Sequence, residues 1–233
     1  LLNIYIKLLS VRKKYLLENT KIDYIFLQKI LNQIYNTEDV QLQRIQKHID
    51  KKRIYNKHYN SEFEREIDHL KYYPLKNKNE YLKLGSNKWR DKYYKYYFNI
   101  NNIYKSDQLV NTICQKYIEG LQWNVRYYLE GCCSWKWYYP FRAAPCLREL
   151  CQYLNNRIYD CEFDNDTPYL PLHQLSIVLP IKSHHLLPKC IRTSLSHKSN
   201  YLSVFYPQNF NLDKLNKFWL HECEPILPIV NDD

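Results

Sequence analysis

Apolar side chains recur at spacings of three and four residues in several stretches of the chain, which is the pattern of amphipathic helices. The first stretch follows Asp23, which is placed to cap a helix whose apolar face is Phe26, Leu27, Ile30, Leu31 and Ile34. A second helix is predicted from Thr37, with Glu38 and Asp39 at the positive end of its dipole. The longest pattern ends at Gly131, a typical residue after a helix, and consists of Val110, Ile113, Tyr117, Leu121, Val125 and Tyr128.

Shorter elements are predicted on either side of this long helix. Residues 88–98 are dense in aromatic side chains and fit a helix with one aromatic flank. Proline at the first turn predicts short helices over 145–154 and 171–178, with a further one over 188–195. Residues 204–207 and 226–230 look extended. We therefore expect a mostly α, irregular helical domain with long connections and a few short strands near the C-terminus. Within it, 1–75 is a basic helical part, 76–87 a loop, and 88–233 an aromatic-rich part.

Composition narrows the class of protein. The chain has 233 residues, of which 45% are hydrophobic, so a sizeable core can form and wholesale disorder is excluded. Three glycines argue against a glycine-rich nucleotide loop as the functional centre. No apolar run approaches the ~20 residues that cross a bilayer, and no secretory signal is visible, which predicts an intracellular protein without a membrane partner. Residue 1 is Leu and Met is absent, so we expect a piece of a longer or truncated protein.

The positive charge is concentrated in the first part of the chain. Residues 1–100 contain 21 Lys and Arg against 11 Asp and Glu, whereas residues 101–233 contain 13 of each. Such an excess attracts phosphate backbones, because bound phosphates release counterions to the solvent. The alternative is a solvated helical face in a chain of biased composition, and charge alone does not separate the two interpretations.

The residues alone do not predict a metal site in this chain. The eight cysteines form no Cys-x-x-Cys pair, and Cys146 and Cys151 are not at a common zinc spacing. His184, His185 and Cys190 are more simply interpreted as ordinary side chains, and the cysteines as reduced thiols. The densest acidic run consists of Asp160, Glu162, Asp164 and Asp166, and it lacks the glycine and terminal glutamate of a calcium loop.

The short segment after Gly131 carries the candidate binding residues. It contains four large aromatic side chains and two nearby cations, namely Trp135, Trp137, Tyr138, Tyr139, Lys136 and Arg142. Aromatic faces on a surface loop stack on unpaired bases, and adjacent cations hold phosphates. The alternative is an aromatic plug that packs into the core with its polar tips hydrogen-bonded. The residues alone leave both interpretations open.

The order of residues in this region resembles the Xrn/Rat family of 5′→3′ exoribonucleases, in the block after the nuclease domain. The family pattern is matched by Tyr117-Ile118, Gly120-Leu121 and Trp123, then by Tyr127-Tyr128, Gly131-Cys132, 134–140 and Ala144-Pro145. The resemblance continues through 168–175, 178–180 and 186–188, then through 205–207 and to the end of the chain at 226–232.

The resemblance implies a function for the complete protein. Members of this family remove nucleotides one at a time from single-stranded RNA with a 5′ monophosphate. Their catalytic carboxylates bind Mg²⁺ in an N-terminal nuclease domain, which would be missing from this chain. The resemblance therefore implies no catalytic residue in this chain. It also places the acidic run of Asp160, Glu162, Asp164 and Asp166 in a connecting loop, which implies solvated loop charge. The helical segment forms one wall of the active-site pocket, and a Trp stacks on an RNA base; Trp135 and Trp137 are the candidates.

The resemblance also leaves alternatives and suggests a location. The main alternative is a catalytically inert, stand-alone RNA-binding or scaffold module derived from the family. Residues 186–188 favour the cytoplasmic mRNA-decay branch over the nuclear one.

Overall fold

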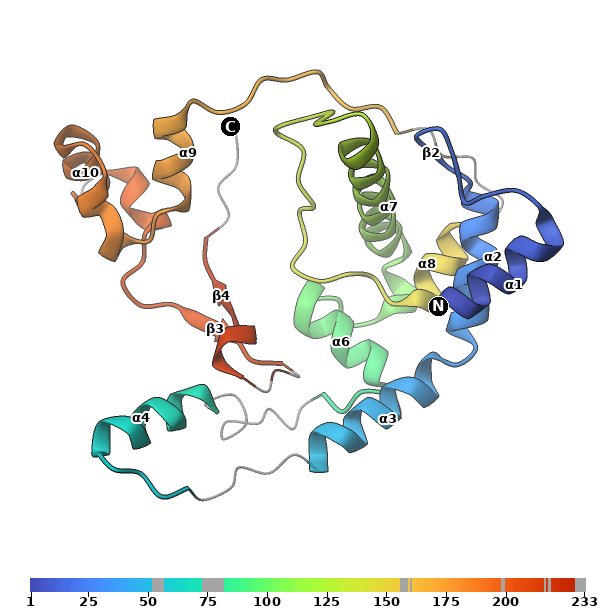
Figure 1. The fold of residues 1–233 in the computed structure, drawn as a ribbon, viewed down its shortest axis with the longest axis horizontal. Helices are drawn as coiled ribbons and strands as arrows, with labels where there is room; N and C mark the ends of the chain where they lie inside the picture. Colours follow the sequence, from blue (N-terminus) through green and yellow to red (C-terminus); the bar gives the residue numbers. More distant parts are fainter. Residues whose placement is uncertain are drawn as a thin grey trace. The chain divides into compact units, whose positions relative to one another are not determined.

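The computed structural model describes residues 1–51, 57–72, 82–155, 159, 161–197, 200–215, 217 and 219–228. The chain forms two compact units that interleave along the sequence. Unit 1 contains Leu1–Lys52 and Tyr81–Thr167, and unit 2 contains Arg53–Glu80 and Pro168–Asp233. The elements of each unit can be followed by label in Figure 1.

The first part of unit 1 consists, in chain order, of helix α1 (Leu2–Arg12), strands β1 (Leu17–Glu18) and β2 (Lys21–Ile22), and helices α2 (Tyr24–Tyr35) and α3 (Glu38–Lys51). The two strands pair antiparallel as a short hairpin. Its end leads directly into the cap of α2.

The start of α2 is fixed by the side chain of Asp23. Its carboxylate accepts a hydrogen bond from the backbone N–H of Phe26 at 2.9 Å and pairs with Arg12 at the end of α1. Partial burial alone would raise the pKa of Asp23, but the bonds to Arg12 and Phe26 outweigh it, and the pKa is lowered. The cap therefore also ties α1 to α2.

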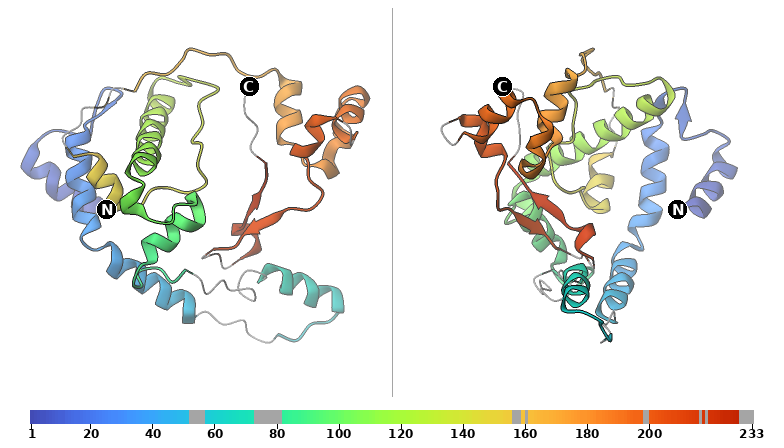
Figure 2. Two further views of the ribbon diagram at one scale, coloured as in Figure 1. Left: turned by 180° about the vertical axis from the view of Figure 1, so that it is seen from behind. Right: turned by 60° about the vertical axis from the view of Figure 1, so that its left-hand side comes forward.

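The second part of unit 1 is built around a long helix. In chain order it contains α6 (Trp89–Phe98), the 3₁₀ turn η1 (Ile103–Lys105), α7 (Asp107–Leu129) and α8 (Leu147–Tyr153). Helices α2 and α7 both pack against α8, as Figure 2 shows from behind and from the side. The most deeply buried side chains of unit 1 are Phe26, Leu82, Tyr94, Ile113, Cys114, Ile118 and Leu150, and all but Leu82 come from α2, α6, α7 and α8.

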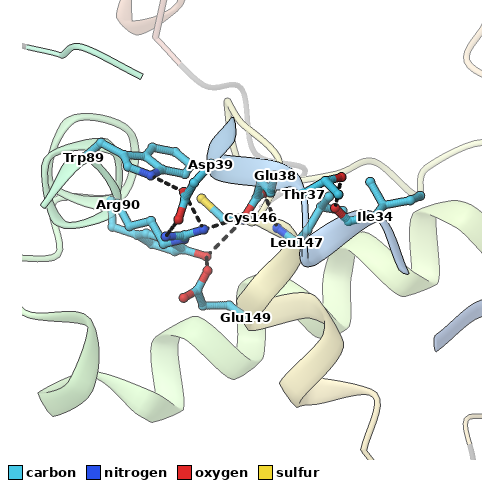
Figure 3. Close-up of polar contacts among 10 residues, drawn as sticks. Ile34, Thr37, Glu38, Asp39, Trp89, Arg90, Cys146, Leu147 and Glu149 are labelled. Carbon is cyan, nitrogen blue, oxygen red and sulfur yellow. Dashed lines mark hydrogen bonds and ion pairs between the residues drawn. The ribbon is translucent and has the colours of Figure 1, made fainter. Parts of the chain in front are cut away.

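A polar joint connects three helices beside this core, and we define it as Glu38, Asp39, Trp89, Arg90 and Leu147 (Figure 3). Arg90 pairs with Glu38 at 2.7 Å and with Asp39 at 3.0 Å. Asp39 also accepts a hydrogen bond from the indole N–H of Trp89 at 2.8 Å. The other oxygen of Glu38 accepts from the backbone N–H of Leu147 at 3.2 Å, so Glu38 caps α8 in place of a local side chain.

The chain between α3 and α6 passes very close to α3. Gly85 has φ +72°, and a Cβ there would lie 2.6 Å from Gln43 Cγ and 2.8 Å from the carbonyl oxygen of Asp39. Gln43 in turn donates a hydrogen bond to the carbonyl of Gly85 at 2.8 Å. Glycine is required here both by its backbone conformation and by the available space.

Unit 2 consists of short elements. In chain order these are α4 (Glu62–Lys71), α9 (Pro171–Val178), η2 (Ile181–Leu186), α10 (Lys189–Ser196), η3 (Tyr201–Phe205), β3 (Asn211–Asp213), η4 (Leu220–Glu222) and β4 (Glu224–Ile226). Strands β3 and β4 pair antiparallel, with Leu212 opposite Pro225. The rings of Tyr72 and Trp219 lie 4.8 Å apart and join the end of α4 to η4. Buried His184 contacts the ring of Tyr206 at 4.7 Å.

The fold confirms most of the predicted elements. The fold is mostly helical, α9 has the predicted bounds, and α2, α3, α6, α7 and α10 begin or end within about two residues of the prediction. Gly131 follows α7 with φ +103°, and its N–H bonds to the carbonyl of Arg126 at 3.2 Å. No helix among the described residues is long and apolar enough to cross a membrane.

Two predictions about extended segments need correction. Residues 204–205 belong to η3 rather than to an extended segment, because Asn200 caps a 3₁₀ turn by accepting from the N–H of Leu202. Short strands were expected only near the C-terminus, but β1 and β2 form a second pair near the N-terminus. Of the segment expected to be extended at 226–230, Ile226 ends β4, and 229–230 lie outside the described residues. The same is true of 76–81 in the predicted loop. The three-part division at residues 75 and 87 stays a prediction.

We predict that Glu38→Gln lowers the free energy of unfolding by about 2–4 kcal/mol, because it leaves the arginine of a largely buried ion pair without its main partner. The matched control is Glu62→Gln in α4. Glu62 pairs with Arg65 at the same 2.7 Å, but its side chain is 77% exposed against 9% for Glu38. The control is expected to cost about 0.5 kcal/mol or less. Urea unfolding checks both, and equal losses would contradict the role given to the polar joint.

Candidate nucleic-acid interface

The predicted aromatic segment is a loop that turns back along α7. We define the aromatic loop as residues 131–145. It begins at Gly131 after the last turn of α7 and leads into α8. Inside it, the ring of Trp137 lies directly on the backbone of α7 at Gly120. A Cβ at Gly120 would be 2.8 Å from Cη2 of Trp137, so the glycine allows the loop to approach the helix.

Ser134 is the internal anchor of the loop. It is 4% exposed, and its hydroxyl accepts a hydrogen bond from the N–H of Trp137 at 3.1 Å. Its carbonyl accepts from the indole N–H of Trp123 on α7 at 3.0 Å. The loop is therefore tied to α7 by a hydrogen bond as well as by ring packing.

A carboxylate from outside the loop completes the anchor. Asp166 accepts from the hydroxyl of Ser134 at 2.6 Å, from the backbone N–H of Trp135, and from the N–H of Lys136 at 3.0 Å. Partial burial alone would raise the pKa of Asp166, but these hydrogen bonds outweigh it and lower the pKa. The charged carboxylate is thus the form that holds the loop.

The aromatic rings behind the loop form an ordered stack. The rings of Trp123 and Tyr127 are parallel within 8° at 5.1 Å, and those of Trp123 and Trp137 within 22° at 6.0 Å. The edge of Phe163 meets Trp137 at 6.0 Å and 89°. Trp137 is therefore part of the packing, as the alternative interpretation of an aromatic plug predicts.

The outward side of the loop carries different residues. Trp135 is 53% exposed and Tyr138 is 51% exposed, and Lys136 and Arg142 are also exposed. Tyr139 is half-buried, and its hydroxyl donates to the carbonyl of Ala143 at 2.8 Å. Burial raises the pKa of Tyr139, so it remains an uncharged phenol. Of the two tryptophans left as candidates, the structure exposes Trp135 and packs Trp137.

Sequence reasoning missed the residues that support the loop. The interpretation of Asp166 as solvated loop charge is wrong, because it bonds to three groups of the loop. Exposed Glu162 and Asp164 agree with that interpretation, and Asp160 lies outside the described residues. The partners of Asp166 are 30 to 32 residues away in sequence, so no local spacing could reveal them. The described residues contain no group of three or more His, Cys, Asp or Glu that could hold a metal ion.

The most basic stretch of the sequence falls at the end of α3. Lys47, His48 and Lys51 are exposed there, whereas Lys52 and Arg53 lie outside the described residues. This part of the chain therefore presents positive charge to the solvent, as both interpretations of the charge excess require.

The described structure is that of a mostly helical domain with an anchored aromatic loop after its longest helix. A family model described as the Xrn1 helical domain matches residues 66–232. The chain belongs to this family.

Curated relatives support the same assignment. The chain is 33% identical to 5′-3′ exoribonuclease 2 of Arabidopsis thaliana over 151 residues, covering 65% of this chain and 15% of the relative. It is 32% identical to 5′-3′ exoribonuclease 1 of Schizosaccharomyces pombe over 176 residues, covering 73% and 13%. For 5′-3′ exoribonuclease 1 of Saccharomyces cerevisiae the identity is 36% over 145 residues, covering 62% and 9%. The chain thus spans about a seventh or less of each of these relatives.

We predict that Asp166→Asn speeds amide hydrogen exchange at Trp135 and Lys136 by about tenfold or more, because a neutral amide is a weaker acceptor than a carboxylate. The matched control is Asp164→Asn, two residues away, whose exposed side chain makes no described hydrogen bond to the loop. Unchanged exchange in Asp166→Asn would contradict the anchoring role.

We also predict that Gly120→Ala destabilises the protein, although alanine favours a helix over glycine by about 1 kcal/mol. The new methyl group would overlap the ring of Trp137. In a Trp137→Leu background the overlap is removed, and the same alanine is expected to be stabilising. Thermal unfolding of the two single variants and the double variant checks this, and an alanine that stabilises both backgrounds would refute the close packing.

Proposed function

We propose that this chain is the helical part of a 5′→3′ exoribonuclease that degrades single-stranded RNA carrying a 5′ monophosphate. The names of the curated relatives support the activity, and the family assignment supports the role of a helical segment. In this proposal the aromatic loop forms part of the wall of the active-site pocket. The observation that carries it is the exposure of Trp135 and Tyr138 on a loop whose backbone is fixed by Asp166.

Each exposed group of the loop has a role in the proposal. Trp135 stacks on an RNA base, and Tyr138 offers a second aromatic surface, which suits an enzyme that must accept every sequence. Lys136 and Arg142 contact the phosphates, with Arg142 adding to the favourable potential along the strand. Trp137 and Tyr139 support the loop from inside rather than touching RNA.

The reaction itself is assigned to residues outside this chain. Mg²⁺ is the metal that the family implies, and it supplies activated water and charge stabilisation for phosphodiester hydrolysis. The described residues do not fit this ion, since they contain no cluster of ligands. We therefore place Mg²⁺ on carboxylates of a nuclease domain. Separately, we propose that the activity takes place in the cytoplasm rather than in the nucleus.

A surface of unit 1 supports contact with such a domain. An apolar groove of about 570 Å³ is lined by α1, the segment that follows it and α2. Leu2 and Tyr15 on this groove are 67% and 73% exposed. Exposed apolar side chains gathered in one groove are a common feature of interaction surfaces. We propose the nuclease domain as its occupant.

The test is single-stranded RNA binding and turnover by the native protein with Trp135→Ala. Loss of one stacked base is expected to weaken RNA affinity by roughly 5- to 150-fold, which corresponds to about 1–3 kcal/mol. The unfolding temperature should change little, because Trp135 is exposed. The control is Tyr104→Ala, which removes an aromatic side chain that is 71% exposed and lies outside the loop.

The outcomes separate the proposed roles. Wild-type affinity and turnover in Trp135→Ala would overturn the stacking role. RNA binding that depends on Trp135, in a native protein of 28.7 kDa without nuclease activity, would favour the inert RNA-binding module instead.

A further inference from the structure

Unit 1 contains a small polar cavity whose lining is cationic. Its volume is about 210 Å³, and it lies between β2, the start of α2, the C-terminal part of α7 and the segment that follows α8. The polar lining residues are Lys21, Tyr24, Gln122, Arg126, Tyr159 and Cys161. Two of them are cations and none is a carboxylate. We propose that this cavity binds a phosphate group.

Arg126 is the residue that points to an anion. The Nε atom of its guanidinium is buried and has no hydrogen-bond partner among the described residues. A buried charged donor without a hydrogen-bond acceptor is costly, and phosphate oxygens, like carboxylate oxygens, are acceptors that a guanidinium binds strongly. Nε forms only a long ion pair with Glu130, whose carboxylate oxygen lies 4.0 Å away, and the side chains of Arg126 and Glu130 are 29% and 54% exposed. Glu130 also accepts a hydrogen bond from Thr20 at 2.9 Å.

The position of the guanidinium is set before any ligand arrives. Its carbon lies 5.7 Å from the ring centre of Phe163, within the range of a cation–π contact. The ring thus limits the movement of Arg126 without using its N–H donors. Affinity for an anion gains from such preorganisation, because less side-chain freedom is lost on binding.

The walls of the cavity are fixed by hydrogen bonds of their own. Gln122 is 4% exposed, donates to the carbonyl of Thr20 at 2.5 Å, and accepts from the N–H of Ile22 and the hydroxyl of Tyr24, each at 3.3 Å. This amide ties the hairpin that carries Lys21 to α7. The hydroxyl of Tyr159 donates to the carbonyl of Tyr153 at 2.7 Å. The two cations are therefore held on a rigid frame.

The size of the cavity limits what it takes. Pockets for whole small-molecule ligands usually measure about 300–1,000 Å³, so this one suits a phosphate group better than a complete nucleotide. The phosphate could belong to the RNA backbone or be free in solution. The backbone is favoured, because Phe163 contacts both Arg126 and Trp137 and so links the cavity to the aromatic loop. Binding of an RNA phosphate in this cavity rests on the proposed function, whereas binding of free phosphate does not.

The experiment uses the native protein with Arg126→Gln and with Lys21→Gln, which keeps the test informative if the first variant folds poorly. The control is Arg65→Gln, which removes the same charge from an exposed arginine of α4. Single-stranded RNA affinity is measured over a series of salt concentrations. Unfolding temperatures are measured with inorganic phosphate and with chloride at equal ionic strength.

If the cavity holds the RNA backbone, Arg126→Gln and Lys21→Gln each weaken RNA binding by about tenfold or less. Each variant also reduces the slope of log affinity against log salt concentration by about 0.7, which is the value for one phosphate contact in a single strand. If it holds free phosphate, RNA binding is unchanged, and phosphate stabilises the wild type and Arg65→Gln but not the two cavity variants. If neither result is found, the phosphate site is refuted. The proposed function would still stand if Trp135→Ala weakened RNA binding in the same assay.

Discussion

The candidate interface depends on one carboxylate that belongs to a distant part of the chain. Asp166 takes hydrogen bonds from a buried hydroxyl and from two successive backbone N–H groups, which are the groups that a tight loop most often leaves without partners. With those donors satisfied, the backbone of Trp135 is fixed while its indole is directed to the solvent. The alternative way to fix such a loop is to pack its aromatic side chains against the rest of the protein, and Trp137, two positions further along, does this. Anchoring by Asp166 is what allows the two tryptophans to have opposite surroundings.

The same device recurs elsewhere in unit 1. Asp23 accepts from the start of α2, and Glu38 accepts from the start of α8 over a distance of 109 residues in sequence. Each of these acids also pairs with an arginine, Arg12 in one case and Arg90 in the other. Such contacts join helices without large apolar areas, which suits a chain with many short elements and irregular connections. These carboxylates are engaged in contacts between helices, whereas lysines such as those at the end of α3 are exposed to the solvent.

The sequence was sufficient for the elements that are determined locally. The spacing of apolar side chains predicted α2, α3 and α7, and proline and glycine marked the start of α9 and the end of α7, because these signals act within one or two turns. The residues of the aromatic loop were also identified from sequence. Their orientations were not, since the exposure of Trp135 and the packing of Trp137 follow from Gly120, Trp123 and Asp166, whose contacts are made only after folding. The wrong prediction of an extended segment at 204–205 has a similar origin. Its β-branched and aromatic residues are typical of strands, whereas capping by Asn200 gives a 3₁₀ turn.

The internal stack also gives the loop a direct connection to the cationic cavity. The ring of Trp137 stacks on that of Trp123 and meets that of Phe163 at 89°, and Phe163 lies against the guanidinium of Arg126. In the proposed function, a phosphate on Arg126 would be held beside this packed group, and a base on the indole of Trp135 would be held by the loop that the group anchors. Packed interiors deform little, so the spacing between these two contacts is fixed by the protein rather than by the ligand. The proposed exoribonuclease, which would move its RNA by one nucleotide at a time, would require such a constant spacing, because each step would have to bring an equivalent base and phosphate into the same positions. The aromatic plug and the binding loop, which were competing interpretations of one sequence segment, are then two faces of the same structure.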